Sequence, residues 1–460
     1  MNNIKSTLKD KPIMRWTVLL MIAFVQAANY YFYDTLSPLK RNLEEAFQFT
    51  NTDFGLFVSA YSIPNIFFLM CLWGGIILDR LGIRRTGFMF IILMTAGAAV
   101  TAYGASDYYS SGGPGYAFFT TFLTDYSPEL KMMLLGRLIF GLGAETSIVV
   151  VSKVIVKWFK GKELATAFGL KIGIARSGSF AAFYFSPAIA EASSTWVNAI
   201  WFAVILLCIG LLSFLIYSFV DRRFDKQIQQ TSLMSDDERF HFSDIVKLLT
   251  NRSFIFVTLL CMTFYSAVFP FQSFSPDFLL NKFGVTQEVS GRIASLLSVG
   301  TIFFTPLIGL FVDKKGRSAS LMIIGSIMLV IIHLMFALTT FSPIILMILL
   351  GVAFSLVPAA MWPSVAKIVD EKRIGSAYGT MFAIQNLGLW AFPLLIGIVL
   401  DKTNPGVTPE AVTEGSASYN YTYAILMLAM LGIIGLVFAI LLKREDKTSG
   451  YGLELPSNSK

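Results

Sequence analysis

Residues 140–178 have the sequence FGLGAETSIVVVSKVIVKWFKGKELATAFGLKIGIARSG, and this stretch decides how the rest of the chain is interpreted. It consists of two long apolar segments joined by a short basic turn. Each segment contains two ionisable residues, Glu145 and Lys153 in the first and Lys171 and Arg176 in the second. Because a charge inside an apolar span is costly and usually functional in a membrane, the stretch predicts two neighbouring spans with a charged site.

The stretch is repeated in the second half of the chain. Residues 350–388 have the sequence LGVAFSLVPAAMWPSVAKIVDEKRIGSAYGTMFAIQNLG and align with the first stretch without a gap. In this alignment Ser355 stands opposite Glu145, and Asn386 stands opposite Arg176. The repeat predicts two related halves, of which only the first keeps the charges.

Composition places the chain in the membrane class. Of its 460 residues, 55% are hydrophobic and only 14% are charged, whereas soluble proteins carry about 25% charged residues. Apolar runs of about 20 residues, the length that crosses a bilayer core of roughly 30 Å, recur through most of the sequence. The net charge of +7 comes from basic residues in short turns between these runs, which indicates membrane topology rather than nucleic-acid binding.

The apolar runs predict an all-α membrane protein with twelve transmembrane helices in two pseudo-symmetric six-helix bundles. We expect an N-terminal bundle over 1–220, a cytoplasmic linker over 221–252, and a C-terminal bundle with a cytoplasmic tail over 253–460. Most Lys and Arg residues fall in segments that lie inside when both termini are cytoplasmic. The predicted spans are 14–38, 53–79, 86–106, 130–157, 163–190, 196–220, 253–278, 289–312, 318–341, 343–369, 374–400 and 420–442.

A motif that follows the second span returns after the eighth span. GIILDRLGIRR at 75–85 and GLFVDKKGR at 309–317 share the pattern GxxxD(R/K)xG followed by arginine. Its glycines permit close helix approach and a tight turn, and its acid can hold a helix end in one conformation and release it in another. This duplicated motif resembles the signature of the major facilitator superfamily. LLGRLIFGLG in the fourth span is similar to another motif of that family, and we expect gating residues in these motifs: Asp79, Arg80, Arg84, Arg137, Asp313 and Arg317.

Several shorter pieces resemble one branch of that superfamily. NYYFYD, YSIPN, GAE with WFKGKELATAFGL, AVFPF, and MWP with GSAYGTMFAIQNLGL look like the major facilitator superfamily domain-containing protein one family, whose animal members are lysosomal dipeptide transporters. The resemblance implies carriage of dipeptides, with Glu145 and Arg176 as binding residues, and a possible accessory subunit. Lys153 and Lys171 depart from what this family leads us to expect.

The positions of the charges have two physical interpretations. Glu145 and Arg176 both fall near the middle of their predicted spans, where each requires a charged partner or a wet cavity. They can form an ion pair that only ties two helices together. Alternatively they can clamp a zwitterion, Arg176 receiving its carboxylate and Glu145 its ammonium. Lys171 can assist Arg176, and Lys153 can either extend to the inner surface or act on substrate.

Aromatic and amide residues at similar depth can complete a binding pocket. We also find no nucleophile–base, metal-ligand or phosphate-loop pattern, so we expect no enzyme activity, metal or cofactor. The pocket candidates are Asn29, Tyr30, Tyr33, Tyr61, Tyr265, Trp362, Gln385 and Asn386.

Together these features predict a secondary transporter that works by alternating access in the lipid bilayer. A dipeptide or similar small zwitterion is the first candidate cargo. An organic anion or phosphate ester, moved by exchange or proton symport and bound by Lys153, Lys171 and Arg176, is the second. The charge bias of the loops suits a bacterial plasma membrane.

Overall fold

The computed structural model describes residues 8–159, 162–228, 247–370 and 373–456. In these residues the regular secondary structure consists of helices, which are joined by turns and loops. In this described part, eleven helices have more than 20 residues, and all of them except Leu164–Ala192 contain a stretch that is long and apolar enough to cross a membrane. The long helices are α1 (Pro12–Thr35), α5 (Met70–Gly104), α8 (Pro128–Phe159), α9 (Leu164–Ala192), α10 (Val197–Ile228), α12 (Arg252–Phe283), α13 (Gln287–Lys315), α14 (Ser318–Leu338), α15 (Pro343–Ile368), α16 (Ile374–Thr403) and α18 (Thr422–Ser449).

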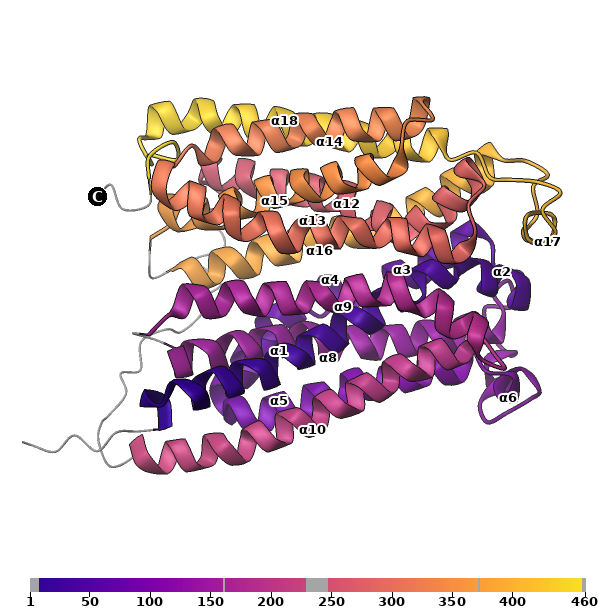
Figure 1. Cartoon of the computed structure of the whole chain (residues 1–460), viewed down its shortest axis with the longest axis horizontal. Helices are drawn as coiled ribbons and strands as arrows, with labels where there is room; N and C mark the ends of the chain where they lie inside the picture. Colours follow the sequence, from indigo (N-terminus) through magenta and orange to yellow (C-terminus); the bar gives the residue numbers. More distant parts are fainter. Residues whose placement is uncertain (1–7, 160–161, 229–246, 371–372, 457–460) are drawn as a thin grey trace, which may run out of the picture.

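The two halves of the sequence form two layers of helices. Helices α1 to α10 make one layer and α12 to α18 the other (Figure 1). The layers meet where α9 packs along α13 and where α16 packs along α3 (Asn51–Ala60). We call the end where α1 begins and α18 ends the terminal end. The opposite end, the loop end, carries α2 (Lys40–Phe47), α6 (Asp107–Ser110), α7 (Tyr116–Phe119) and α17 (Pro409–Thr413) (Figure 1).

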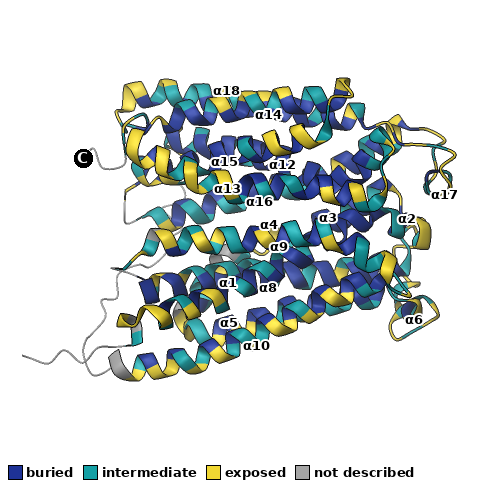
Figure 2. Cartoon of the chain, in the orientation of Figure 1, coloured by how far each residue is buried: buried dark blue, intermediate teal, exposed yellow. Residues whose placement is uncertain are grey.

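Large apolar side chains are exposed along the outer faces of the helices. Leu212 and Phe219 on α10, Phe303 and Leu307 on α13, and Met430 on α18 are all more than half exposed, and exposed residues recur along these helices (Figure 2). Such a surface would aggregate in water but matches the hydrocarbon of a bilayer. The exposed faces therefore agree with the predicted membrane class.

The predicted second span is interrupted. Its residues form α3, the short α4 (Ile63–Phe67) and the first part of α5, and Leu69 between them has a left-handed backbone with φ 49°. The chain turns again at Gly82 inside α5, where φ is 76°, and at its repeat counterpart Gly316, where φ is 72°. Both motif glycines thus have the backbone that favours glycine, as the tight turn of the sequence motif predicts.

Glycines bring α5 and α8 into close contact. A Cβ atom on Gly97 would lie less than 3.0 Å from the backbone of Phe140, and one on Gly143 would lie as close to the backbone of Met94. Small residues let helix backbones approach in a membrane, where packing rather than the hydrophobic effect holds helices together. This helix pair forms the rigid part of the first layer.

We expect Gly97→Ala to lower the thermal unfolding temperature of the purified protein by several degrees, because the added methyl group meets backbone atoms that cannot move alone. Gly309→Ala on α13 is the matched control, since its Cβ would have nothing within 4 Å. That control should be neutral, or stabilising by up to about 1 kcal/mol through helix propensity. Tryptophan fluorescence during heating measures both, and equal temperatures for the two variants would contradict the proposed packing role.

Candidate functional site

Arg176 lies between the two layers of helices. It is located near the middle of α9 and is 9% exposed. Its guanidinium carbon is 5.2 Å from the ring centre of Tyr30 on α1, 5.0 Å from that of Phe269 on α12, and 5.1 Å from that of Phe354 on α15. A cation over aromatic faces at this range is attracted by about 0.5–2 kcal/mol. The predicted clamp residue therefore contacts both halves of the chain.

The two phenylalanines belong to an aromatic group in the second layer. Phe269 stacks on Tyr265 with 5.6 Å between ring centres, and Phe354 packs edge-on against both rings at 5.5 Å. The indole of Trp362 donates a hydrogen bond from Nε1 to the Tyr265 hydroxyl over 3.1 Å. These contacts fix the orientation of the rings around Arg176, and they include the predicted residues Tyr265 and Trp362.

Glu145 lies near the middle of α8 and is half-buried. Its carboxylate interacts electrostatically with the hydroxyls of Tyr61, Tyr33 and Tyr30. Tyr30 also packs against the guanidinium of Arg176, and the rings of Tyr33 and Tyr61 pack edge-on with 4.7 Å between their centres. The same phenol, Tyr30, therefore interacts with both predicted clamp charges.

Arg137, which the sequence predicts as a gating residue, lies in an aromatic cage next to this group. It is 1% exposed, and its NH2 group donates a hydrogen bond to the Tyr33 carbonyl over 2.9 Å. Its guanidinium carbon is 4.7 Å from the ring centre of Tyr33 and 5.1 Å from that of Phe57. Tyr33 interacts with both Arg137 and Glu145. The aromatic cage therefore borders the candidate site on the side of the loop end.

The other predicted amide residues differ in their partners. Asn29 on α1 is buried. Gln385 on α16 accepts a hydrogen bond from the Cys261 thiol over 3.4 Å. Asn386 donates from Nδ2 to the Phe382 carbonyl over 2.9 Å, while its buried Oδ1 has no hydrogen-bond partner among the described residues.

The two lysines lie closer to the terminal end than the clamp residues do. Lys171 precedes Arg176 by five residues, or about 7.5 Å along the helix axis. Lys153 follows Glu145 by eight residues, or about 12 Å. Lys171 is half-buried and Lys153 is exposed. Neither lysine therefore shares the depth of the charges that the structure groups together.

Sequence reasoning missed Phe269 and Phe354. Phe269 lies in the AVFPF segment, and Phe354 directly precedes Ser355, the repeat counterpart of Glu145. Both positions therefore lie in or next to a segment that the sequence analysis singles out. Phenylalanine is so common in apolar spans, however, that nothing in the sequence distinguishes a ring beside a cation from a ring in lipid.

Arg84, another predicted gating residue, belongs to an ion network at the terminal end. Its NH1 atom lies 2.9 Å from the carboxylate of Asp221 and 2.5 Å from that of Asp225, both on α10. Lys157 on α8 binds the same two carboxylates over 2.8 and 2.6 Å. Trp158 adds a hydrogen bond from Nε1 to Asp221 over 3.2 Å. The network ties α5, α8 and α10 together.

At the corresponding place in the second layer, the C-terminal segment provides the partners. The backbone N–H of Arg317 donates to the Glu454 carbonyl over 3.0 Å, and the Glu454 carboxylate accepts from the N–H and hydroxyl of Ser320 over 2.8 and 2.7 Å. Lys367, the repeat counterpart of Lys157, donates to the Leu455 carbonyl over 2.8 Å. The predicted tail is thus docked on the second layer.

The remaining predicted gating residues lie on the surface of the terminal end or outside the described residues. The side chains of Arg80, Asp313 and Arg317 are exposed, and Asp313 has an interaction partner. The side chain of Asp79 lies outside the part of the chain that the structure describes. A gating role remains a prediction for these four residues.

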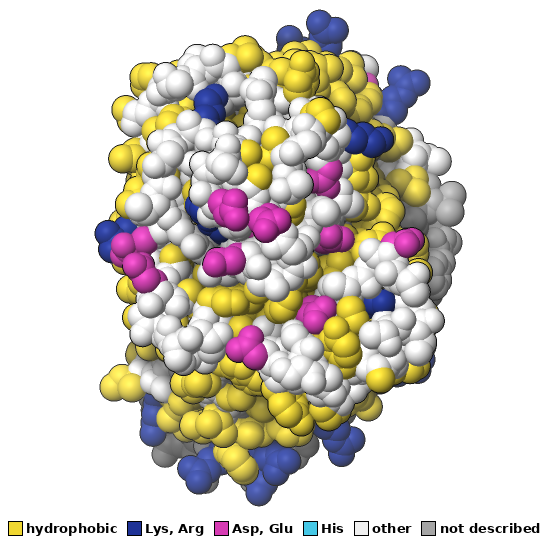
Figure 3. Space-filling model, turned by 90° about the vertical axis from the view of Figure 1, so that its right-hand side faces the viewer, with side chains coloured by type: hydrophobic (Ala, Val, Ile, Leu, Met, Phe, Trp, Pro, Cys, Tyr) yellow, Lys and Arg dark blue, Asp and Glu magenta, His cyan; other side chains and the backbone are white. Residues whose placement is uncertain are grey.

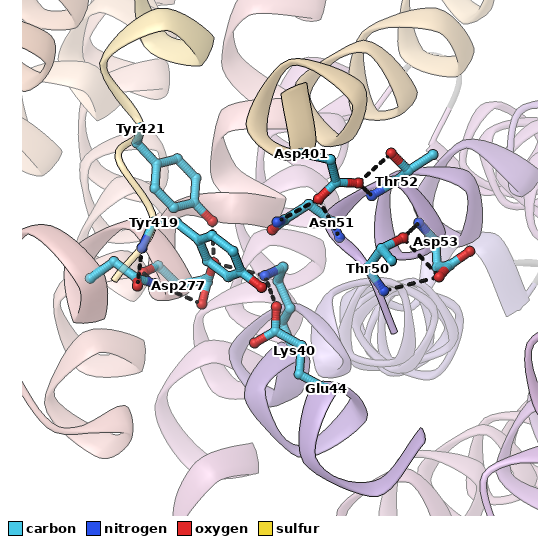
Figure 4. A network of polar contacts seen from close by, with 11 residues as sticks. Lys40, Glu44, Thr50, Asn51, Thr52, Asp53, Asp277, Asp401, Tyr419 and Tyr421 are labelled. Atoms are coloured by element: carbon cyan, nitrogen blue, oxygen red, sulfur yellow. Dashed lines mark hydrogen bonds and ion pairs between the residues drawn. The ribbon is translucent and has the colours of Figure 1, made fainter. Parts of the chain in front are cut away.

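Polar contacts join the two layers at the loop end. Lys40 on α2 lies 2.8 Å from the carboxylate of Asp277 on α12. The carboxylate of Asp401 at the end of α16 accepts hydrogen bonds of 2.5–3.2 Å from Asn51 and Thr52 at the start of α3 (Figure 4), where a helix N-terminus favours negative charge. Acidic side chains gather around the middle of this face (Figure 3). In this conformation the loop end is closed.

Comparison with known proteins agrees with the arrangement of the helices. The profile of the Major Facilitator Superfamily matches residues 19–388 and 265–457. The lysosomal dipeptide transporter MFSD1 of Mus musculus is 31% identical over 402 residues, which cover 84% of this chain and 80% of the relative. The hexuronate transporter of Bacillus subtilis (strain 168) is 21% identical, with coverage of 84% and 88%.

Solved transporter structures share the fold. The crystal structure of the nucleoside transporter NupG superimposes with a TM-score of 0.66 at 17% identity and covers 93% of this chain and 99% of its own. The D-xylose-proton symporter gives a TM-score of 0.69 at 16% identity, with coverage of 92% and 97%. With a matching family profile over most of its length and the same helical architecture, the chain belongs to the Major Facilitator Superfamily and is a secondary transporter.

Proposed function

We propose that this transporter carries dipeptides or similar small zwitterions, with Arg176 binding the carboxylate of the cargo and Glu145 its ammonium. The observation that carries the proposal is the position of Arg176 between the layers, where its guanidinium packs on Tyr30 of the first layer and on Phe269 and Phe354 of the second. Glu145, on the adjacent helix α8, interacts with the same Tyr30. The opposite charges of Arg176 and Glu145, which interact with the same tyrosine, suit a cargo that has a carboxylate at one end and an ammonium at the other. The similarity to MFSD1, a lysosomal dipeptide transporter, points to the same cargo class.

The aromatic rings around Arg176 suit variable cargo side chains. Phe269 and Phe354 offer apolar surface that requires no hydrogen-bond partner, so they tolerate different cargo side chains at the same place. The guanidinium meanwhile offers two parallel N–H donors, which match the geometry of a free carboxylate. A site that binds the two charged ends of the cargo and accepts different side chains between them would be specific for dipeptides as a class.

Transport itself requires the two layers to separate alternately at each end. We propose that residues 1–220 and 253–460 move as the two units, and that the terminal end faces the cytoplasm of a bacterial cell. The basic residues near that end support this orientation. An accessory subunit stays a possibility that only the resemblance to the MFSD1 family raises.

A second cargo class has support from particular residues. Lys171 and Lys153 lie between the candidate site and the terminal end. An anion that leaves the site in this direction would therefore move past two positively charged side chains. A relative at 21% identity, the hexuronate transporter of Bacillus subtilis, is named for an anionic sugar. An organic anion or phosphate ester is therefore the alternative cargo.

A ligand screen by thermal unfolding separates the two classes. We expect millimolar dipeptides to raise the unfolding temperature by a few degrees, since a ligand at 100 times its Kd stabilises by about 2.7 kcal/mol. N-acetylated and C-amidated versions of the same dipeptides should give no shift, because each removes one charged end. Stabilisation by hexuronates or sugar phosphates, without any by dipeptides, would replace the first cargo class with the second.

A further inference from the structure

The loop end contains a buried cluster of charges that the transport site does not use. The Nζ atom of Lys40 lies 2.5 Å from Oε1 of Glu44 and 2.8 Å from Oδ2 of Asp277 (Figure 4). The three side chains are only 1%, 1% and 2% exposed. The hydroxyl of Tyr421 also bonds to the Asp277 carboxylate, and the ring of Tyr419 covers the ammonium with its centre 5.0 Å from Nζ.

The cluster has one negative charge more than it can neutralise. Two carboxylates share one ammonium, and the second oxygen of Glu44, Oε2, is buried without a hydrogen-bond partner among the described residues. An ionised carboxylate with an unpaired buried oxygen is costly, because nothing replaces the water that it loses. A proton on that oxygen would remove both the excess charge and the charged acceptor.

The neighbouring cation Arg41, also on α2, supplies only part of the missing positive charge. Arg41 is half-buried, it attracts the Glu44 carboxylate more weakly than Lys40 does, and its guanidinium donates to the carbonyls of Val412 and Thr413. Asp401 on α16 adds a further negative charge in the neighbourhood of Tyr419. On α12, Asn281 donates an amide hydrogen bond to Asp277.

The hydroxyls of the two tyrosines of the cluster remain neutral. Burial raises the pKa of the Tyr419 hydroxyl, and Glu44 raises it further. Burial and the adjacent Asp277 carboxylate raise the pKa of Tyr421 well above its ordinary value. Neither hydroxyl can therefore give up a proton to the carboxylates, so a proton that neutralises the cluster has to come from solution.

The cluster exists only while the loop end is closed. Lys40 and Glu44 belong to the first layer, whereas Asp277, Tyr419 and Tyr421 belong to the second. Separation of the layers at this end would expose both carboxylates to water, which solvates each of them without a shared cation.

We propose that the Lys40–Glu44–Asp277 cluster is a proton-binding site that takes up a proton at Glu44 when the loop end closes and releases it when the loop end opens. The state that binds more protons gains stability as pH falls. Acid therefore holds the loop end closed, and alkaline solution favours its opening. This inference does not depend on the identity of the cargo.

Hydrogen–deuterium exchange of the purified full-length protein without cargo tests the site. We compare the exchange of segments 37–50 and 414–421 at pH 5.5 and 7.5, after correction for the intrinsic pH dependence of amide exchange. The wild-type protein should exchange more slowly at pH 5.5, by up to about tenfold for each pH unit over which the site titrates. Glu44→Gln, which imitates the protonated acid, should exchange slowly at both pH values.

Glu45→Gln is the matched control, because Glu45 is the next residue of α2 and is exposed. It should keep the pH dependence of the wild-type protein. Asp277→Asn removes the other carboxylate and should abolish the pH dependence as Glu44→Gln does, which keeps the test valid if one variant does not fold. A wild-type pH dependence in folded Glu44→Gln protein, or equal exchange at both pH values in the wild-type protein, would overturn the proposal.

Discussion

Arg176→Ala is expected to reduce transport of the cargo to the background of empty vesicles, while the protein remains folded and monodisperse. The substitution removes the guanidinium, which packs over the rings of Tyr30, Phe269 and Phe354. A charge-assisted bidentate contact to a carboxylate is worth about 2–5 kcal/mol when one partner is removed, so the loss in affinity should exceed roughly 30-fold. Uptake of radiolabelled dipeptide into proteoliposomes measures the effect.

Two further variants give this experiment its controls. Arg176→Lys keeps the positive charge but loses the planar fork, so it should retain only partial uptake. Arg292→Ala removes an exposed arginine whose guanidinium carbon lies 5.3 Å from the ring centre of Tyr184, and it should transport normally. Near-normal uptake by Arg176→Ala would exclude this residue from the cargo site.

The sequence contains enough information for the fold and for the central charges. Repeats at Gly82 and Gly316 predict a duplicated turn, and both glycines have positive φ. The placement of Glu145 and Arg176 near the middle of two neighbouring spans follows from counting residues, because a helix has a constant rise. Such features are local or periodic, and a single sequence reports them directly.

Contacts between the two layers could not be predicted in this way. Lys40 falls between the first two predicted spans, 14–38 and 53–79, so the sequence predicts a solvated turn there. The structure nevertheless buries Lys40 at 1% exposure, because Asp277, more than 200 residues away, supplies its counter-charge. The docking of Glu454 on Ser320 is missed for the same reason. Pairings of this kind depend on which helix ends meet in space, and no periodicity in one chain records that.

The ion network at the terminal end provides a test in which two neighbouring acidic residues bind the same cations but differ in burial. Asp221 and Asp225 occupy successive turns of α10 and bind the same two cations, Arg84 and Lys157. The Asp221 side chain is 1% exposed, whereas that of Asp225 is 31% exposed. Asp221 also accepts the indole hydrogen bond of Trp158. Because Asp221 is more deeply buried and has one more hydrogen-bond donor, substitution of Asp221 should cost more stability than substitution of Asp225.

We expect Asp221→Asn to destabilise the protein by about 3 kcal/mol, which for a chain of this length corresponds to a fall in unfolding temperature of about 3 °C. The substitution leaves the carboxylate of Asp225 as the shared partner of Arg84 and Lys157, and it places an uncharged amide at the buried position. Asp225→Asn should cost about 0–1 kcal/mol, because water solvates the half-exposed site. Thermal unfolding followed by tryptophan fluorescence measures both, and salt up to 1 M should reduce the difference between Asp225→Asn and wild type first, since exposed charges are screened more strongly. Equal destabilisation by the two variants would show that the network acts as a surface ion cluster and does not anchor α10 to α5 and α8.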